Sequence, residues 1–129
     1  MAEFYGFDGL MTAGTFKVDT TTASTVSADP NQLVCKAVTA TGDGEVGYGS
    51  SSDRILGIVQ TVEKESTNSD KLVVCVKFVG TFEDIPYTSA PSVGDAIAVD
   101  GNGGVVKSDS GKGQVLAVNS TDSTCTILL

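Results

Sequence analysis

Short apolar runs alternate with turn-forming residues from residue 33 to residue 129. This pattern is typical of an all-β protein with many short strands. No segment has the repeat of an amphipathic helix sustained over several turns, so we expect little helix. The runs predict strands at residues 33–39, 55–64, 72–79, 94–99, 105–107, 114–119 and 124–129.

The segments between these runs carry turn chemistry. Residues 41–44 predict a tight turn, and residues 65–70 predict a polar loop joining two strands. The strongest signal is the glycine-rich segment at residues 100–104, because its Asn-Gly step tolerates positive φ. The strand expected over residues 72–79 is apolar on both faces, which predicts burial on both sides or one face at a subunit contact.

The N-terminal quarter has a different composition. Residues 1–16 hold half of the aromatic residues, and residues 19–32 are small and polar, which is typical of a linker or a loosely ordered loop. We therefore expect an N-terminal arm and polar linker at residues 1–32. Residues 33–129 would form the body, so that the chain is one small all-β domain, a β-barrel or sandwich with an extended N-terminal arm.

Size and charge narrow the classes of function. The chain has 129 residues and a net charge of −8, which suits one domain and disfavours nucleic acid as a partner. No apolar run approaches the ~18–20 residues of a membrane-spanning helix, so we expect no membrane partner. The first charges are acidic and glycines interrupt the apolar residues, so we expect no signal peptide.

The chain offers little for catalysis. It contains no histidine, which removes the commonest general base and metal ligand. Cys35, Cys75 and Cys125 are widely spaced within apolar runs and predict reduced thiols that pack as small apolar residues. Two carboxylate pairs, Glu83 with Asp84 and Glu63 with Glu65, are candidates for acid–base work, although adjacent acids are usually solvated. We predict a protein that is not an enzyme and has no cofactor or metal.

Three glycine-containing segments match known motifs only in part. Residues 42–47 fit G-x-G-x-x-G, but they contain two acids and no helix opener follows. Residues 110–113 lack the other glycine and the hydroxyl of a phosphate-binding loop. Residues 100–104 begin like a calcium loop, but the glycine and glutamate required further on are missing. We predict no nucleotide or metal site at any of them.

The aromatic arm is the main candidate for an interaction site. Aromatic side chains supply large contact area with few torsions to freeze, and methionine adapts its shape to a partner. The arm could pack on its own barrel, on another protein, or on a neighbouring copy of the chain. The candidate contact residues are Phe4, Tyr5, Phe7, Leu10, Met11 and Phe16.

Four segments of the body carry a resemblance to a known family. They are Ile55-Leu56-Gly57-Ile58-Val59, the valine-rich run at residues 72–76 that closes on Gly80, the Gly-Asp strand entry at residues 91–97, and residues 113–118. In this order they resemble the capsid decoration (head cement) proteins of tailed bacteriophages. The resemblance covers residues 33–129, and the first 32 residues match nothing in that family.

The resemblance implies a small β-barrel that is not an enzyme and that binds the outer surface of an assembled phage head. It implies the major capsid protein as partner and a homotrimer at local three-fold positions, where it would stabilise the head. The location would be the capsid exterior of the virion, after synthesis in the cytoplasm of the host bacterium. The alternatives are another β-type phage subunit (tail tube, connector or fibre base) or a glycan-binding β module, for which only Tyr48 and Tyr87 lie in predicted loops of the body.

Overall fold

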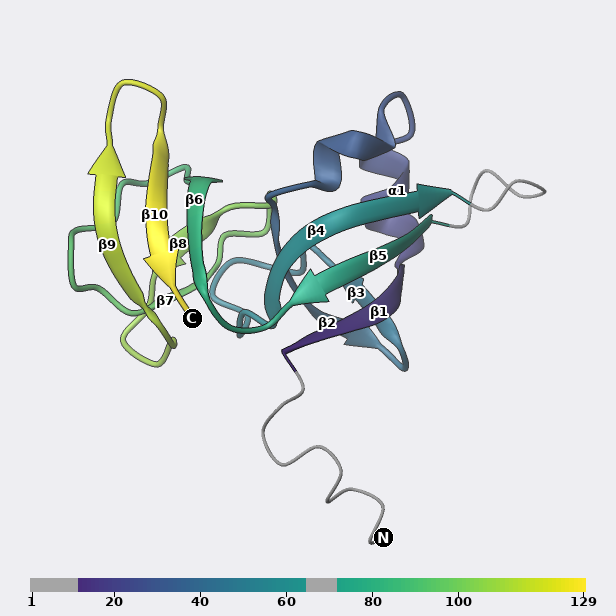
Figure 1. Cartoon of the computed structure of the whole chain (residues 1–129), viewed down its shortest axis with the longest axis horizontal. Coiled ribbons are helices and arrows are strands. Elements are labelled where there is room, and N and C mark those ends of the chain that lie inside the picture. The colour runs from purple at the N-terminus through teal and green to yellow at the C-terminus, as the bar shows by residue number, and fades with distance from the viewer. Residues whose placement is uncertain (1–11, 65–71) are drawn as a thin grey trace, which may run out of the picture.

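The computed structural model describes residues 12–64 and 72–129, and 49% of these residues are in strands and 9% in helices. The all-β prediction is therefore confirmed (Figure 1). The elements in order are β1 (Ala13–Val18), α1 (Thr20–Thr25), the 3-10 helix η2 (Pro30–Leu33), β2 (Ala37–Gly42), β3 (Glu45–Gly47), β4 (Gly57–Lys64), β5 (Leu72–Lys77), β6 (Thr81–Pro86), β7 (Ile97–Val99), β8 (Val105–Lys107), β9 (Gln114–Asn119) and β10 (Thr124–Leu128).

Five strands form a closed barrel in the order β1-β3-β2-β4-β5. Strand β1 completes the closure, because it pairs antiparallel with β5 and parallel with β3. Alternate residues of these strands point inward and form an apolar core. Its buried members are Val18, Val26, Leu33, Val38, Val46, Val59, Leu72, Val74 and Val76.

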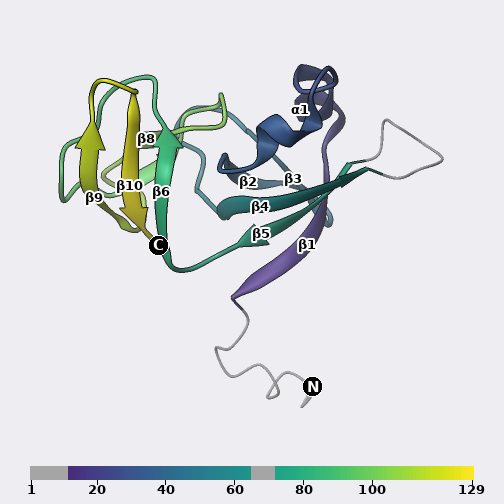
Figure 2. The same cartoon turned by 45° about the horizontal axis from the view of Figure 1, so that its top comes forward.

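A second unit contains the three-stranded sheet β6-β10-β9 and the hairpin β7-β8. Figures 1 and 2 show it beside the barrel; β5 leads toward it into β6, whereas β4 starts near it and runs away from it. Its core includes Ala37 and Ile58, which come from barrel strands β2 and β4. These two strands therefore contribute side chains to the cores of both units. The remaining buried members are Ile55, Phe82, Ile85, Ile97, Val99, Val105, Val115, Cys125 and Ile127.

The structure differs from the expected boundary between linker and body at residue 32. Strand β1 is a barrel strand, and the supposed linker holds α1 and η2. The Asp19 side chain caps α1 by accepting a hydrogen bond from the Thr22 N–H at 2.8 Å. Val26 and Leu33 are buried at 2% and 0% exposure and fix the segment to the barrel core. Two apolar anchors in a polar stretch are too few to give a visible periodicity.

Most predicted strands are present, some with shifted ends. The strand expected at residues 33–39 begins only at Ala37, because Leu33 closes η2 and Cys35 has a φ of 69°. The three strands missed from the sequence are β1, β3 and β6. In β6 the alternation is broken by Asp84, which has a φ of 60° and lies where the ladder with β10 shifts register.

Candidate functional site

Of the six predicted contact residues, only the last lies in the described part of the chain. Phe4, Tyr5, Phe7, Leu10 and Met11 lie outside the described residues. Phe16 is half-buried on β1 and packs against the barrel core. Its ring meets Phe78 edge-to-face, with 6.0 Å between centroids and 67° between planes. Phe16 therefore packs on the barrel of its own chain, which is one of the three alternatives that the sequence left open for the arm.

The described chain starts at a well-fixed point of the barrel wall. The Phe78 N–H donates a hydrogen bond to the Thr12 carbonyl oxygen at 2.7 Å, directly before β1 begins. Gly14 leaves room for the two rings, because a Cβ there would lie 3.0 Å from Phe78 Cζ and 3.1 Å from Phe16 Cε2. The neighbouring Val79 is 44% exposed. We call Thr12, Phe16, Phe78 and Val79 the arm base, since the N-terminal residues continue from it.

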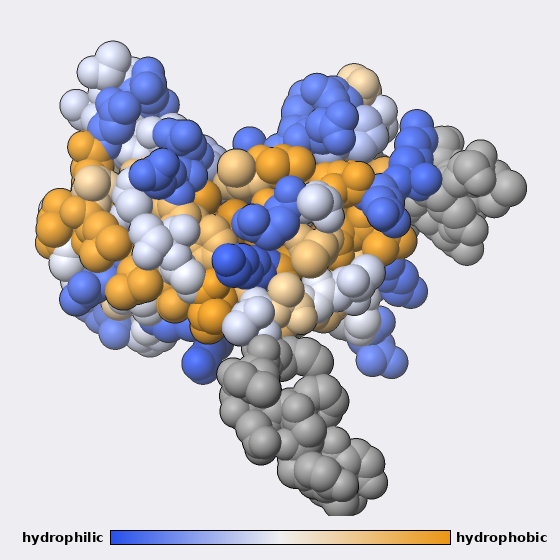
Figure 3. Space-filling model, in the orientation of Figure 1, coloured by the Kyte–Doolittle hydropathy of each residue, from blue (hydrophilic) through white to orange (hydrophobic). Residues whose placement is uncertain are grey.

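Further apolar side chains outside the arm base are exposed. Val93 is 66% exposed, Leu128 42% and Leu116 41%. Figure 3 shows orange apolar surface over both units on this face, interrupted by hydrophilic side chains. Scattered exposed apolar residues are normal for a soluble protein, so this surface is compatible with contacts to another protein but does not define one.

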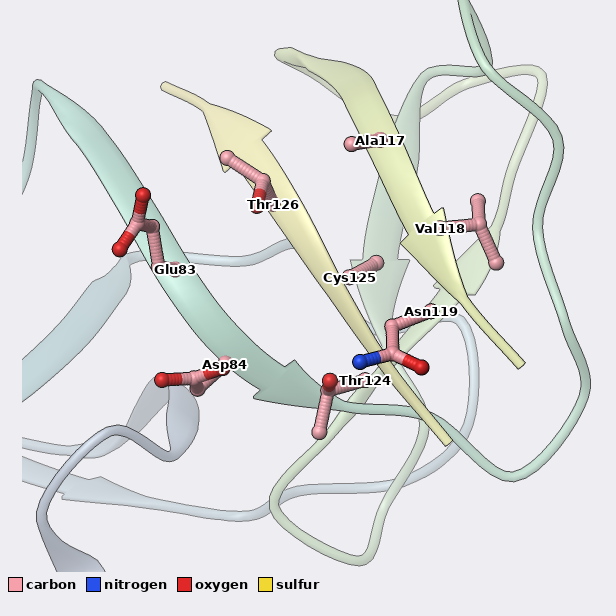
Figure 4. Close-up of a pocket in the computed structure, with 8 residues that line it drawn as sticks. All are labelled: Glu83, Asp84, Ala117, Val118, Asn119, Thr124, Cys125 and Thr126. Carbon is pink, nitrogen blue, oxygen red and sulfur yellow. The ribbon is translucent and has the colours of Figure 1, made fainter. Parts of the chain in front are cut away.

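The carboxylate pair Glu83 and Asp84 is exposed on β6 and lines a cavity of about 280 Å³. Figure 4 shows residues of β9 and β10 lining the rest of this cavity, among them Asn119 and Thr124. The Asn119 amide is used within its own turn: Nδ2 donates to Asp122, and Oδ1 accepts from two backbone N–H groups. The amide is therefore occupied by its own turn and does not orient the carboxylates.

Cys125 lines the same cavity and is the one thiol there. Burial raises the pKa of the Cys125 thiol to about 11, so the sulfur stays protonated near neutral pH and is a poor nucleophile. Of the other carboxylate pair, Glu63 is exposed on β4 and Glu65 lies outside the described residues.

The three partial motifs have structural roles in the fold. Residues 42–47 contain the β2–β3 turn and strand β3, and a loop follows them instead of a helix. Asp100 Oδ1 accepts hydrogen bonds from the N–H groups of Asn102 and Gly104 at 2.7 and 2.9 Å, so this carboxylate stabilises its own turn. In the third motif Lys112 is paired with Ile97 through two backbone hydrogen bonds.

A second cavity, of about 270 Å³, was not found by sequence reasoning. Its lining comes from three separate segments: α1 with its N-cap residue, the loop after β3, and the β7–β8 turn. Only the position of Tyr48 in a predicted loop gave a signal, because the other lining groups are common turn and cap residues. The lining residues are Asp19, Thr21, Thr22, Thr25, Tyr48, Gly49, Ser50 and Gly101.

Comparison with family models, with curated proteins and with solved structures found no match to this chain. Within residues 12–64 and 72–129, no three His, Cys, Asp or Glu side chains gather in a way that could hold a metal ion. Among the described helices, none has the length and apolar character to cross a membrane.

Proposed function

We propose that this protein is a capsid decoration protein of a tailed bacteriophage, which binds the outside of the assembled head as a homotrimer and stabilises it. The observation that carries the proposal is the position of the four family-like segments. In the structure they form or lead into β4, β5, β7 and β9, which belong to one small all-β body. These strands contribute to both apolar cores, so the resemblance involves the residues that determine the fold.

A protein of this kind stabilises a head by binding its assembled form. A ligand that binds the assembled lattice and not the separate subunits shifts the equilibrium toward assembly by mass action. A trimer multiplies weak contacts, because the second and third contacts form at high effective concentration. The net charge of −8 keeps free copies apart before they bind.

In this proposal the N-terminal arm supplies the principal contacts with the capsid or with a neighbouring copy. The arm base is fixed to the barrel by the Thr12–Phe78 hydrogen bond and by the pairing of β1 with two strands. Binding of Phe4, Tyr5 and Phe7 to a partner would therefore hold the whole barrel on the surface. Large aromatic side chains are the residues that most often dominate such contacts.

The test uses heads of the phage that encodes this chain, prepared without it. We expect the purified protein to co-sediment with these heads, to saturate, and to raise the temperature at which they open. Unassembled capsid subunits should not bind. A chain that does not bind the heads, or binds loose subunits equally well, would contradict the proposal.

The role of the arm is tested by deleting residues 2–11, which keeps Thr12 and all of β1. We expect this variant to remain folded and to lose most head binding. The matched control is Leu116→Ser, which removes an exposed apolar side chain of β9 and should bind heads as the intact chain does. If the deletion variant coats heads to full occupancy, the arm is not the contact.

Native mass spectrometry tests the oligomeric part of the proposal. We expect a species of three times the 13.2 kDa chain mass. A monomer at concentrations where the protein saturates heads would contradict the trimer.

A further inference from the structure

Two hydrogen bonds shape the cavity between α1 and the loop after β3, one joining the loop to α1 and one within the loop. The Tyr48 N–H donates to Thr22 Oγ1 at 3.0 Å, which ties the loop to a residue that is only 3% exposed. The Ser50 N–H donates to Asp53 Oδ2 at 2.9 Å and shapes the loop. The third wall is Gly101, where a Cβ would lie 3.2 Å from the Ser51 nitrogen, so the two loops are in close contact.

Hydroxyl groups dominate the polar part of the lining. Thr21 and Thr25 are four residues apart on α1 and therefore lie on the same side of the helix. Thr25 Oγ1 donates to the Thr22 carbonyl at 2.7 Å and keeps its lone pairs free to accept. Thr21 and Ser50 are exposed and can both donate and accept. The cavity can therefore exchange several hydrogen bonds with a ligand rich in hydroxyl groups.

Tyr48 is the one aromatic residue in the lining of the cavity. Its ring is half-buried and lies close to Gly103, where a Cβ would come within 3.0 Å of Tyr48 Cζ. Burial raises the pKa of the Tyr48 phenol, which therefore stays neutral in the physiological range and can donate a hydrogen bond. An aromatic ring with a polar tip suits a ligand that is apolar on one face and hydroxylated at its edge.

Charge and size define the ligand further. Asp19 is the one charged residue in the lining, and together with the net charge of −8 it disfavours phosphate and carboxylate ligands. The volume of about 270 Å³ lies just below the roughly 300–1,000 Å³ of sites for drug-sized ligands, so a single sugar ring is the appropriate size.

We propose that this cavity binds one neutral monosaccharide unit, with the sugar ring against Tyr48 and its hydroxyls bonded to Thr21, Thr25 and Ser50. The unit is either a free sugar or the end of a glycan, since both present the same ring and hydroxyl groups. The site lies apart from the N-terminal arm in sequence, and the inference does not depend on capsid binding.

The test is an NMR titration of the full chain, following backbone amide signals. The ligands are glucose, galactose, mannose and N-acetylglucosamine, each as the free sugar and as a short oligosaccharide that ends in it. We expect at least one sugar to shift the amides of Gly49, Ser50 and Gly101, with Kd on the order of 1 mM for such an open site. Tighter binding of the oligosaccharide would identify a glycan as the source, and equal binding a free sugar. The 6-phosphate of whichever sugar binds should bind more weakly than that sugar, because the cavity contains a carboxylate and no cation.

Substitutions locate the binding. Thr21→Phe fills the cavity from α1 and should weaken binding at least about tenfold. Thr20→Phe adds the same ring to an exposed neighbour that does not line the cavity, and should leave binding unchanged. Circular dichroism checks folding, and Ser50→Phe closes the cavity from the opposite side if Thr21→Phe does not fold. The inference is overturned if no sugar shifts these amides at about 50 mM, well above the expected Kd, or if a folded variant with a filled cavity binds as before.

Discussion

The turn between β7 and β8 depends on one carboxylate. Asp100 Oδ1 accepts the Asn102 and Gly104 N–H groups at 2.7 and 2.9 Å, and Oδ2 accepts the Thr88 hydroxyl at 3.2 Å. Asp100→Ala removes all three bonds and leaves the N–H of buried Gly104 without this acceptor. A buried donor that loses its partner costs ~1–3 kcal/mol, and Asp100 itself is only half-buried, so we expect a loss of about 2 kcal/mol in the free energy of unfolding.

Thermal and urea denaturation, followed by circular dichroism, measure this loss. For a chain of this size, about 2 kcal/mol corresponds to a fall of roughly 8 °C in Tm. Asp100→Asn keeps the Oδ1 acceptor and should lose less than half as much free energy of unfolding as Asp100→Ala. Asp109→Ala, at an exposed aspartate, should change the free energy of unfolding by less than about 0.5 kcal/mol. If Asp100→Ala is as stable as Asp109→Ala, or if the Asn and Ala variants are equally destabilised, the hydrogen-bond reasoning is refuted.

Three further predictions concern the cores and the thiol. Ile127→Ala leaves a cavity at a fully buried position and should lower the free energy of unfolding in urea by about 3 kcal/mol. The control Leu116→Ala, at an exposed position, should lower it by less than about 1 kcal/mol. Similar losses would place Ile127 outside the core. Gly57→Ala sets a Cβ against the Lys77 carbonyl oxygen and should destabilise the protein by more than about 2 kcal/mol. The control Gln60→Ala, on the exposed face of β4, should be nearly neutral. Equal effects of the two variants would contradict the close approach of Gly57 to Lys77. Burial raises the pKa of Cys125 from 9.0 to about 11, so the folded protein holds this proton more tightly than the unfolded chain does. The resulting stabilisation is complete below pH 9.0 and is lost as pH rises to about 11. The free energy of unfolding of Cys125→Ala should therefore fall less over that range than that of the intact chain. An equal fall in both proteins would show that other groups cause it.

The fold class could be predicted because the chain consists of short apolar runs separated by turns, and because β5 and β10 alternate between buried and less buried positions. In β5, Leu72, Val74 and Val76 are buried, while Val73 and Cys75 lie half-buried on the outer face. The outer face of β5 is therefore only half-buried within one chain, and a subunit contact on this face stays a prediction. Strand β1 could not be predicted in the same way, because its inward positions include Gly14, and the pairing that makes it a strand is with distant β3 and β5.

The sequence was less informative about candidate sites. The aromatic arm is visible as composition, and the structure adds its fixed base at Thr12. The Tyr48 cavity could not be predicted, because it requires α1, which forms through the Asp19 cap and the buried Val26 in a stretch without periodicity. It also requires Gly101 to approach the loop after β3, which is a contact between segments some fifty residues apart.

Cryo-electron microscopy of purified virions of the phage that encodes this chain tests the central claim most directly. We expect density on the outside of the head at local three-fold positions, into which three copies of the closed barrel and its three-stranded sheet fit. Density for the chain on the tail or connector, or virions that contain none of it, would contradict the account.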